Sequence, residues 1–361
     1  MSETNSKRTK RRRNNIAYIF EIIVCLIALT AIFIATAMIF KYHSVELEKE
    51  QLQSELAIYQ DPQNPYMTVS EAKQEAESAR AEGVIAGQSG AKEELLEEIK
   101  TTLQDTDSSL ETFKKYFPND VIVVDSGEYL FFPIDNNLEK TDIITSDYTK
   151  NDSGKISYIG TKNISVGIDV SKFQDKINWT KVSEDNVDFA IIRVGYRGYS
   201  KGEIFDDEKF ETNIKGATKN GIDVGVYFLT QATSEDEAIE EAKYVLDQIE
   251  PYKISYPVVL DIEAVGGNEG RGNALTAEDR TKYAIAFLET IKKAGYDVCI
   301  YGNLKTFMLM LDLEQLEEYP KWFAGYTDVP YYPYKYDCWQ YTDSGSISGI
   351  SEKVDLNIYF K

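Results

Sequence analysis

The sequence predicts an α/β protein: a β/α barrel of the (β/α)5(β)3 type, preceded by a single transmembrane helix, a helical stalk and a small β-containing segment. Three observations predict this architecture. From residue 165 onward, five strand-like runs alternate with helical stretches, which indicates a parallel sheet with helical crossovers. Three more strand-like runs follow without a long helix between them, and eight strands are enough to close a barrel. Near the N-terminus, the apolar run 22–40 is long enough to cross a bilayer.

The first forty residues predict a signal-anchor. A basic cytoplasmic tail over residues 1–15 precedes a transmembrane segment over 16–40, and the only polar residues of 22–40 are two threonines. Basic side chains before the span place the N-terminus in the cytoplasm and the rest of the chain outside the cell. A cleaved signal peptide is the alternative, because Ala35-Thr36-Ala37 resembles a small-x-small cleavage site.

Two segments separate this span from the predicted barrel. Residues 41–117 are rich in Glu, Gln, Ala and Leu and predict an extracellular helical stalk, in which Thr68-Val69-Ser70-Glu71 has the pattern of a capping box. Residues 118–162 contain two short β-like runs and predict a small β-containing spacer module. Neither segment shows a chemical motif or identifies a protein partner. The remaining residues, 163–361, form the predicted barrel domain.

Composition excludes several classes of function. The 39 basic and 60 acidic residues give a net charge of −21, which makes nucleic acid an unsuitable partner. His43 is the only histidine, so residues 44–361 cannot contain a Ser-His-Asp triad, a Cys-His dyad or a histidine-ligated zinc. Three cysteines cannot form a disulfide framework. We therefore expect carboxylates to carry any chemistry, without a metal or another cofactor.

Polar and aromatic residues fall at the ends of the predicted strands, where barrels place their chemistry. The strand-like runs are 165–170, 189–194, 223–228, 257–263, 297–301, 321–324, 337–341 and 354–358. The residues at their ends are Asp169, Arg193, Tyr227, Asp261, Glu263, Tyr301 and Asp355. A later segment is dense in aromatic residues and predicts an extended sugar-binding groove: Trp322, Tyr326, Tyr331, Tyr332, Tyr334, Trp339 and Tyr341.

Asp261 and Glu263 are the strongest candidates for catalysis. Strand alternation places both carboxyl groups on one face, with their residues about 6.6 Å apart along the strand. Two carboxylates at such a spacing suit glycoside hydrolysis, with either retention or inversion. Glu263 is the predicted proton donor, because neighbouring carboxylates and burial should raise its pKa. Two alternatives are that Asp261 pairs with Arg193 while Glu263 caps the next helix, and that the acids bind Mg²⁺.

Several ordered motifs carry a resemblance to a known family. They are Gly167-Ile168-Asp169-Val170-Ser171, Phe189-Ala190-Ile191-Ile192-Arg193, Val259-Leu260-Asp261-Ile262-Glu263, Trp339-Gln340-Tyr341 and Val354-Asp355-Leu356-Asn357. With them, the chain from about 164 to 360 resembles glycoside hydrolase family 25, the Chalaropsis-type lysozymes. Two departures are Lys172 and Phe228, at positions where the family often has histidine.

The resemblance implies a lysozyme-type N-acetylmuramidase over 163–361, which cleaves the β-1,4 bond between N-acetylmuramic acid and N-acetylglucosamine in peptidoglycan. It implies that Glu263 is the general acid, that Asp261 is its partner and orients the substrate acetamido group, and that Asp169 and Asp355 are supporting acids. The predicted substrate-binding residues are Tyr227, Arg193, Tyr301, Tyr326, Trp339 and Gln340.

Taken together, these observations predict a membrane-anchored peptidoglycan hydrolase for local cell-wall remodelling. It would bind the glycan strand, sit in the cytoplasmic membrane through residues 16–40, and hold its catalytic domain outside the cell. A non-catalytic protein for wall binding or assembly, using the same groove, is the alternative. A carboxylate–Mg²⁺ phosphohydrolase is a third possibility.

Overall fold

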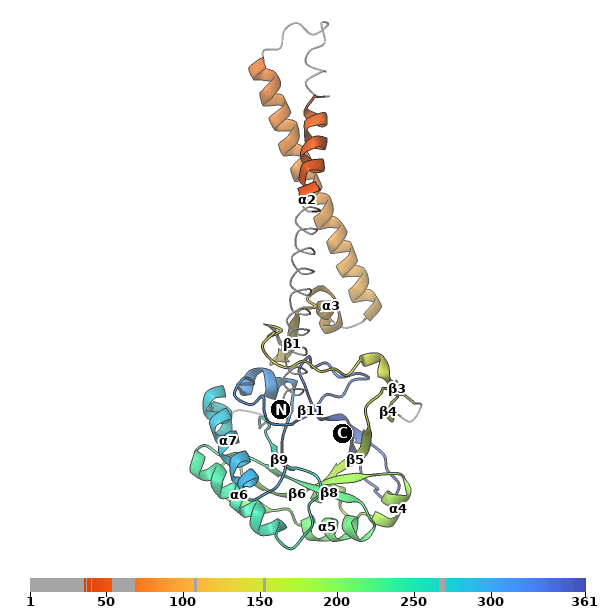
Figure 1. Ribbon diagram of the computed structural model, residues 1–361, viewed down its shortest axis with the longest axis vertical. Helices are drawn as coiled ribbons and strands as arrows, with labels where there is room; N and C mark the ends of the chain where they lie inside the picture. Colours follow the sequence, from red (N-terminus) through yellow and green to blue (C-terminus); the bar gives the residue numbers. More distant parts are fainter. Residues whose placement is uncertain are drawn as a thin grey trace, which may run out of the picture. The chain divides into compact units, whose positions relative to one another are not determined.

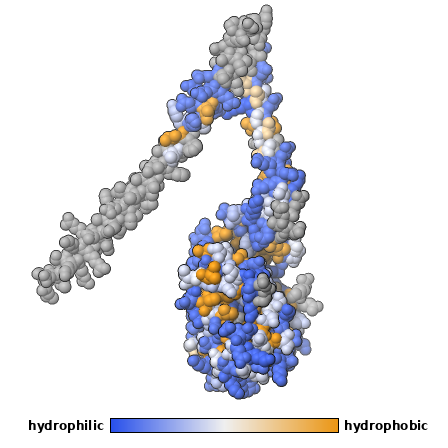
Figure 2. Space-filling model, turned by 90° about the vertical axis from the view of Figure 1, so that its right-hand side faces the viewer, coloured by the Kyte–Doolittle hydropathy of each residue, from blue (hydrophilic) through white to orange (hydrophobic). Residues whose placement is uncertain are grey.

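The computed structural model describes residues 36, 38–39, 41–53, 69–106, 109–151, 154–265 and 270–361. The chain forms two compact units, residues 1–105 and 106–361 (Figure 1). On the face that Figure 2 shows, the described residues are largely hydrophilic, with smaller apolar patches on the C-terminal unit.

The N-terminal unit is helical where it is described. Residues 41–53 are helical, and helix α2 (Val69–Thr106) follows after residues outside the described ranges. Most described side chains of α2 are exposed, and Arg80 in it pairs with Glu48 at 2.5 Å. Exposed surface pairs of this kind contribute little to stability, because water and ions screen them.

The structure corrects the predicted membrane segment. No helix among the described residues is both long and apolar enough to cross a membrane. Helix α2 has the length, but Glu, Lys and Arg recur along it, and their charges would be costly to bury in lipid. On the described residues, the predicted fold class with a transmembrane helix and the predicted single-pass location in the cell membrane are therefore contradicted, and the predicted membrane partner is not supported. Of the segment 16–40 itself, only Thr36, Met38 and Ile39 lie within the described residues.

The C-terminal unit contains a closed barrel of eight strands. In chain order they are β5 (Ile164–Val170), β6 (Phe189–Arg197), β8 (Asp223–Leu229), β9 (Val258–Asp261), β10 (Val298–Asn303), β11 (Lys321–Ala324), β12 (Cys338–Gly345) and β13 (Val354–Phe360). Pairing of β5 with both β6 and β13 closes the ring. A short strand, β7 (Ile204–Asp206), pairs with the end of β6 outside the ring.

The barrel also departs from the predicted regular β/α arrangement. Strand β13 is antiparallel to both of its neighbours, β12 and β5. Only residues 346–353 connect β12 to β13, and a crossover to a parallel strand needs a dozen residues or more. The fifth crossover helix is reduced to η4 (Thr306–Met310), a five-residue π-helical turn. This is an eight-strand barrel with one reversed strand and four full helices on the described chain.

Those four helices cover the outside of β5 to β9. They are α4 (Trp179–Glu184), α5 (Phe210–Lys219), α6 (Glu235–Ile249) and α7 (Ala277–Lys293). The side chains of Ser234 and Thr276 cap the first turns of α6 and α7 by accepting backbone N–H bonds. Both helices turn apolar residues inward, and Phe287 of α7 is fully buried. We call strands β5 to β9 with these helices the helical flank.

A second layer covers the opposite side, β10 to β13 (Figure 1). It comprises α3 (Ser109–Tyr116), the hairpin of β1 (Asp120–Asp125) and β2 (Glu128–Pro133), the short helix η1 (Thr145–Asp147), and the hairpin of β3 (Tyr148–Lys150) and β4 (Ile156–Tyr158). We call residues 109–151 and 154–162 the collar. The ring of Tyr148 packs edge-on against Trp339 with centroids 4.9 Å apart, and its hydroxyl lies 3.1 Å from that of Tyr336.

The interior of the barrel is apolar and aromatic below its polar end. Phe189 and Tyr256 stack with ring centroids 4.5 Å apart, and Tyr359 meets both rings edge-on. Gly167 leaves room for this layer, because a Cβ atom there would overlap the ring of Phe189. This packed layer fills the barrel interior below the polar end.

Candidate active site

The four predicted acids gather at one end of the barrel. Asp169 lies near the end of β5, Asp261 ends β9, and Glu263 follows two residues later. Asp355 lies near the start of β13, and the reversed direction of this strand brings it to the same end, where it pairs in register with Asp169. Burial raises the pKa of Tyr227, and Asp169, Asp261 and Asp355 raise it further, so this tyrosine stands among three acids.

Two side-chain amides hold Asp169. Its Oδ2 accepts hydrogen bonds from Gln340 Nε2 at 2.9 Å and from Asn357 Nδ2 at 2.8 Å. The amide oxygen of Gln340 accepts from the hydroxyls of Tyr301 and Tyr326, at 2.8 and 2.9 Å. These two hydroxyls fix the orientation of the amide, because the Gln340 oxygen is occupied and its nitrogen must face Asp169.

Asn357 and Trp322 extend this network. Asn357 is absent from the predicted site residues, and Trp322 is predicted only as one of the aromatic residues of the sugar-binding groove. The indole Nε1 of Trp322 donates to Asn357 Oδ1 at 2.9 Å, which turns the amide nitrogen of Asn357 toward Asp169. Both residues are buried. The alternation of β13 could have identified Asn357, since it lies two residues beyond Asp355 and therefore on the same inner face.

Asp355 carries a proton at neutral pH. Burial and the neighbouring carboxylate of Asp169 raise the pKa of Asp355 to about 9, and its side chain hydrogen-bonds to Asp169. Burial also raises the pKa of Asp169, although the bonds from Asn357, Gln340 and Asp355 oppose that shift. Asp355 is therefore the donor of this carboxyl pair and Asp169 the acceptor.

Asp261 is buried deeper than Glu263. Burial raises its pKa well above the ordinary value, with further contributions from the charges of Glu263 and Asp169. Its Oδ1 is buried without a hydrogen-bond partner. A buried acceptor without a partner is costly, so this oxygen is placed to accept a hydrogen bond from a ligand.

Glu263 lies at the mouth of the barrel. Its side chain is exposed, yet the protein atoms around it raise its pKa by desolvation, and the charge of Asp169 raises it further. Two bonds hold the backbone here: Gln231 Nε2 donates to the carbonyl of Glu263 at 3.4 Å, and Thr306 Oγ1 donates to that of Ile262 at 3.1 Å.

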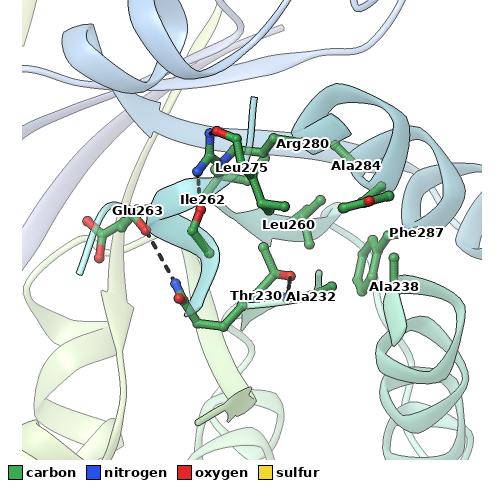
Figure 3. A pocket seen from close by; sticks show the side chains of 13 residues that line it. Thr230, Ala232, Ala238, Leu260, Ile262, Glu263, Leu275, Arg280, Ala284 and Phe287 are labelled. Atoms are coloured by element: carbon green, nitrogen blue, oxygen red, sulfur yellow. Dashed lines mark hydrogen bonds between the residues drawn. The ribbon is translucent and has the colours of Figure 1, made fainter. Parts of the chain in front are cut away.

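Figure 3 shows the Glu263 carboxylate pointing away from the apolar pocket behind strand β9. That pocket has a volume of about 20 Å³ and is lined by apolar residues such as Leu260 and Phe287. It has room for about one water molecule. The carboxylate of Glu263 therefore faces away from this internal cavity.

Arg193 does not form the ion pair with Asp261 that one alternative required. Its Nε donates instead to Asp207 Oδ2 at 2.7 Å, and both side chains are buried. Its guanidinium lies 5.1 Å from the ring centroid of Phe173. The Nη2 group is buried without a partner, which leaves a cationic donor available to a ligand.

Trp339 is the one predicted substrate-binding residue that lies away from the other candidates. It is fully buried on the outer face of β12, packed against Tyr148 of the collar and Tyr341. Its indole nitrogen donates to the carbonyl of Gly325 at 2.9 Å. Tyr332 and Tyr334 are likewise buried packing residues. Of the predicted aromatic groove, Tyr326 is about half exposed at the mouth.

No group of three or more His, Cys, Asp or Glu side chains within the described residues has an arrangement that could hold a metal ion. Of the acids at the mouth, Asp169 instead accepts hydrogen bonds from two side-chain amides and is hydrogen-bonded to Asp355. Their geometry fits proton transfer and hydrogen bonding to a substrate.

The sequence was compared with known families and proteins. A family model of Glycosyl hydrolases family 25 matches residues 168–350, which is 183 of the 361 residues. The uncharacterized protein YegX of Escherichia coli (strain K12) is 28% identical over 204 residues, covering 54% of this chain and 68% of YegX. The autolytic lysozyme of Clostridium acetobutylicum is 24% identical over 192 residues, covering 53% of this chain and 54% of the lysozyme.

A solved structure is also similar. The modular autolysin LytC from Streptococcus pneumoniae, in complex with a synthetic peptidoglycan ligand, superposes with a TM-score of 0.50 and 27% sequence identity. The match covers 67% of this chain and 56% of the LytC chain. This chain therefore spans little more than half the length of the autolysin and of the clostridial lysozyme.

Proposed function

The chain belongs to glycosyl hydrolase family 25, and we propose that it is a muramidase, which cleaves the β-1,4 bond between N-acetylmuramic acid and N-acetylglucosamine in peptidoglycan. One observation carries the proposal: Asp261 and Glu263 stand together at the barrel mouth, and both have raised pKa values. The likeness to an autolytic lysozyme and to an autolysin bound to a peptidoglycan ligand supports this substrate.

Glu263 is the proton donor in this proposal. Burial and the charge of Asp169 raise the pKa of Glu263. Near neutral pH, Glu263 is therefore protonated more often than an ordinary glutamic acid. Its exposed position at the mouth lets it reach the glycosidic oxygen. It gives its proton to that oxygen as the bond to the anomeric carbon breaks, and its carboxylate then accepts a proton from the attacking water.

Asp261 orients the substrate. Its unpartnered Oδ1 accepts the N–H of the acetamido group on the sugar that is cleaved. The acetamido oxygen is then positioned to attack the anomeric carbon and form a ring, which water opens in the second step. The hydrogen bond from this N–H to Asp261 stabilises the positive charge that develops on the group. The buried Nη2 of Arg193 offers a second hydrogen bond to the substrate.

The proposal does not include the predicted role in local cell-wall remodelling. That prediction depended on the transmembrane segment, which the structure does not support. What is proposed is the bond that is cleaved and the residues that cleave it.

Digestion of purified peptidoglycan by the full chain tests the proposal. Borohydride reduction of the products and mass spectrometry should reveal new muramitol ends. Glu263→Gln should lower the rate about 10² to 10⁴-fold, which is the usual contribution of a general acid. Glu184→Gln, an exposed glutamate at the end of α4, is the matched control and should leave the rate unchanged. Binding to the wall without any new sugar ends would instead show a non-catalytic wall-binding protein.

A further inference from the structure

A second hollow lies beside the active site, between the collar and the barrel. It has a volume of about 310 Å³, at the lower end of the range of ligand pockets, about 300 to 1,000 Å³. The collar contributes Lys150, Gly154 and Ile156 to it, and the barrel contributes, among others, Tyr326, Asp343 and Ser344. The collar lies outside the residues that the family model matches, 168–350.

This groove is continuous with the catalytic network. Tyr326 forms part of its wall, and the hydroxyl of the same tyrosine donates to Gln340, which in turn donates to Asp169. Asp343 of the groove also lies close to the catalytic network, since its charge contributes to the raised pKa values of Asp355 and Tyr326. A glycan bound across the mouth would therefore meet the groove as it leaves the catalytic acids.

The side chains of the groove suit a sugar. Tyr326 offers a ring that is 52% exposed, and aromatic rings of this kind stack on the apolar face of a sugar ring. The hydroxyls of Thr342 and Ser344 and the exposed carboxylate of Asp343 can hydrogen-bond to sugar hydroxyls.

A peptide stem with its carboxylates fits less well. The one cationic side chain among the lining residues is Lys150, which is already paired with Asp328 at 2.6 Å. Asp343 also lines the groove, and no such cation is paired with it among the described residues. Its negative charge would repel a carboxylate of the peptide.

We propose that the β3–β4 hairpin and the barrel rim together form an additional glycan-binding position, which holds a sugar residue of the strand beyond the pair joined by the cleaved bond. This rests on the proposed muramidase function. The collar then forms one wall of this position with residues outside the matched family region, and the side chains that contact the sugar come from the barrel rim.

The test measures binding separately from cleavage. Stem-free glycan fragments of increasing length are titrated into the full chain carrying Glu263→Gln, and the dissociation constants are measured by calorimetry. Ser344→Trp is added to fill the groove from an exposed position. Ser157→Trp is the matched control, because Ser157 is an exposed residue of the same hairpin that does not line the groove.

Ser344→Trp should weaken binding of the longer fragments about tenfold and leave the shortest bound fragment unaffected, whereas Ser157→Trp should change neither. Equal affinity of the long fragments with and without Ser344→Trp would overturn the proposal. A matched series of fragments that carry peptide stems is titrated in the same way. A loss confined to that series would also overturn the proposal, since the groove would then bind the peptide. Cleavage of peptidoglycan by the native chain is measured in parallel, so that failure of the groove and failure of the muramidase proposal are distinguishable.

Discussion

The two flanks of the barrel are covered in different ways. On the helical flank, each of the strands β5, β6, β8 and β9 is followed by a helix that packs on the outside. On the other flank, β11 to β13 follow one another without a helix, and the aromatic side chains of the collar cover them. Trp339 on the collar flank and Phe287 on the helical flank are equally inaccessible to solvent.

The difference shows that the outer face of a barrel strand must be covered by apolar side chains. These side chains need not come from the segment that directly follows the strand. The collar precedes the barrel in sequence, yet it seals the strands that end it. Tyr148 of the β3–β4 hairpin can cover the barrel in place of a helix. Its ring is buried at little cost because its hydroxyl forms a buried hydrogen bond with that of Tyr336. The collar is thus part of the fold of the C-terminal unit and not a spacer before it.

The largest predicted effect compares the two covers directly. Trp339→Ala and Phe287→Ala should each lower the free energy of unfolding by about 3–5 kcal/mol, because each leaves a cavity in a fully packed layer. Urea denaturation followed by circular dichroism measures both. If Trp339→Ala alone lowered the free energy of unfolding by less than about 1 kcal/mol, the collar would pack only loosely against the barrel.

The next prediction concerns the seam between the flanks, where Asp169 of β5 pairs with Asp355 of β13. The pKa of Asp355 is raised to about 9 in the folded chain, against about 3.9 for an unfolded aspartic acid. The folded state therefore binds the extra proton between these values. The stability that this proton provides is complete below about pH 4 and is lost as the pH rises toward 9.

Asp355→Asn removes this titration and keeps a hydrogen-bond donor facing Asp169. We expect the variant to lose less stability than the native chain between pH 5 and pH 8, by up to about 1.4 kcal/mol per pH unit. Denaturation midpoints at several pH values give the two slopes. Parallel slopes for the variant and the native chain would contradict the assignment of the proton to Asp355.

The smallest predicted effect concerns the ion pair between Lys305 and Asp125, which joins the barrel to the β1–β2 hairpin at 2.5 Å. Both side chains are about one third exposed. Asp125→Asn should therefore cost about 0–1 kcal/mol, and the cost should shrink in high salt. Thermal denaturation at two ionic strengths measures it. A loss well above this range that shrinks in high salt would mean that charge and not aromatic packing holds the collar in place.

Much of the barrel could be predicted from local patterns. The alternation of strand-like and helical runs identifies the segments that become β5 to β13, because each segment carries its own apolar period. The direction of β13 could not be predicted in this way, since it depends on the length of the preceding loop. The collar could not be predicted either, because contacts such as that of Tyr148 with Trp339 join residues far apart in sequence.

The catalytic candidates show the same division. Asp169, Asp261 and Glu263 could be placed at one end of the barrel from their positions at the ends of their strands. Asp355 lies near the start of β13 and reaches the same end only because that strand is reversed. Aromatic density was a poor guide, since it does not tell on which face of a strand a ring lies. It attributed Trp339 to the substrate groove, whereas strand alternation places this residue opposite to Gln340.

The pairing of β5 with β13 has a consequence for the order in which the enzyme is assembled. Asp169 stands on the first strand of the barrel, whereas Asp355 and Asn357, which contact its carboxylate, stand on the last. A nascent chain lacks these two residues until β13 has been synthesised, and contacts so distant in sequence are slow to form. The acid network is therefore complete only after β13 has paired with β5, which delays activity until that pairing has formed.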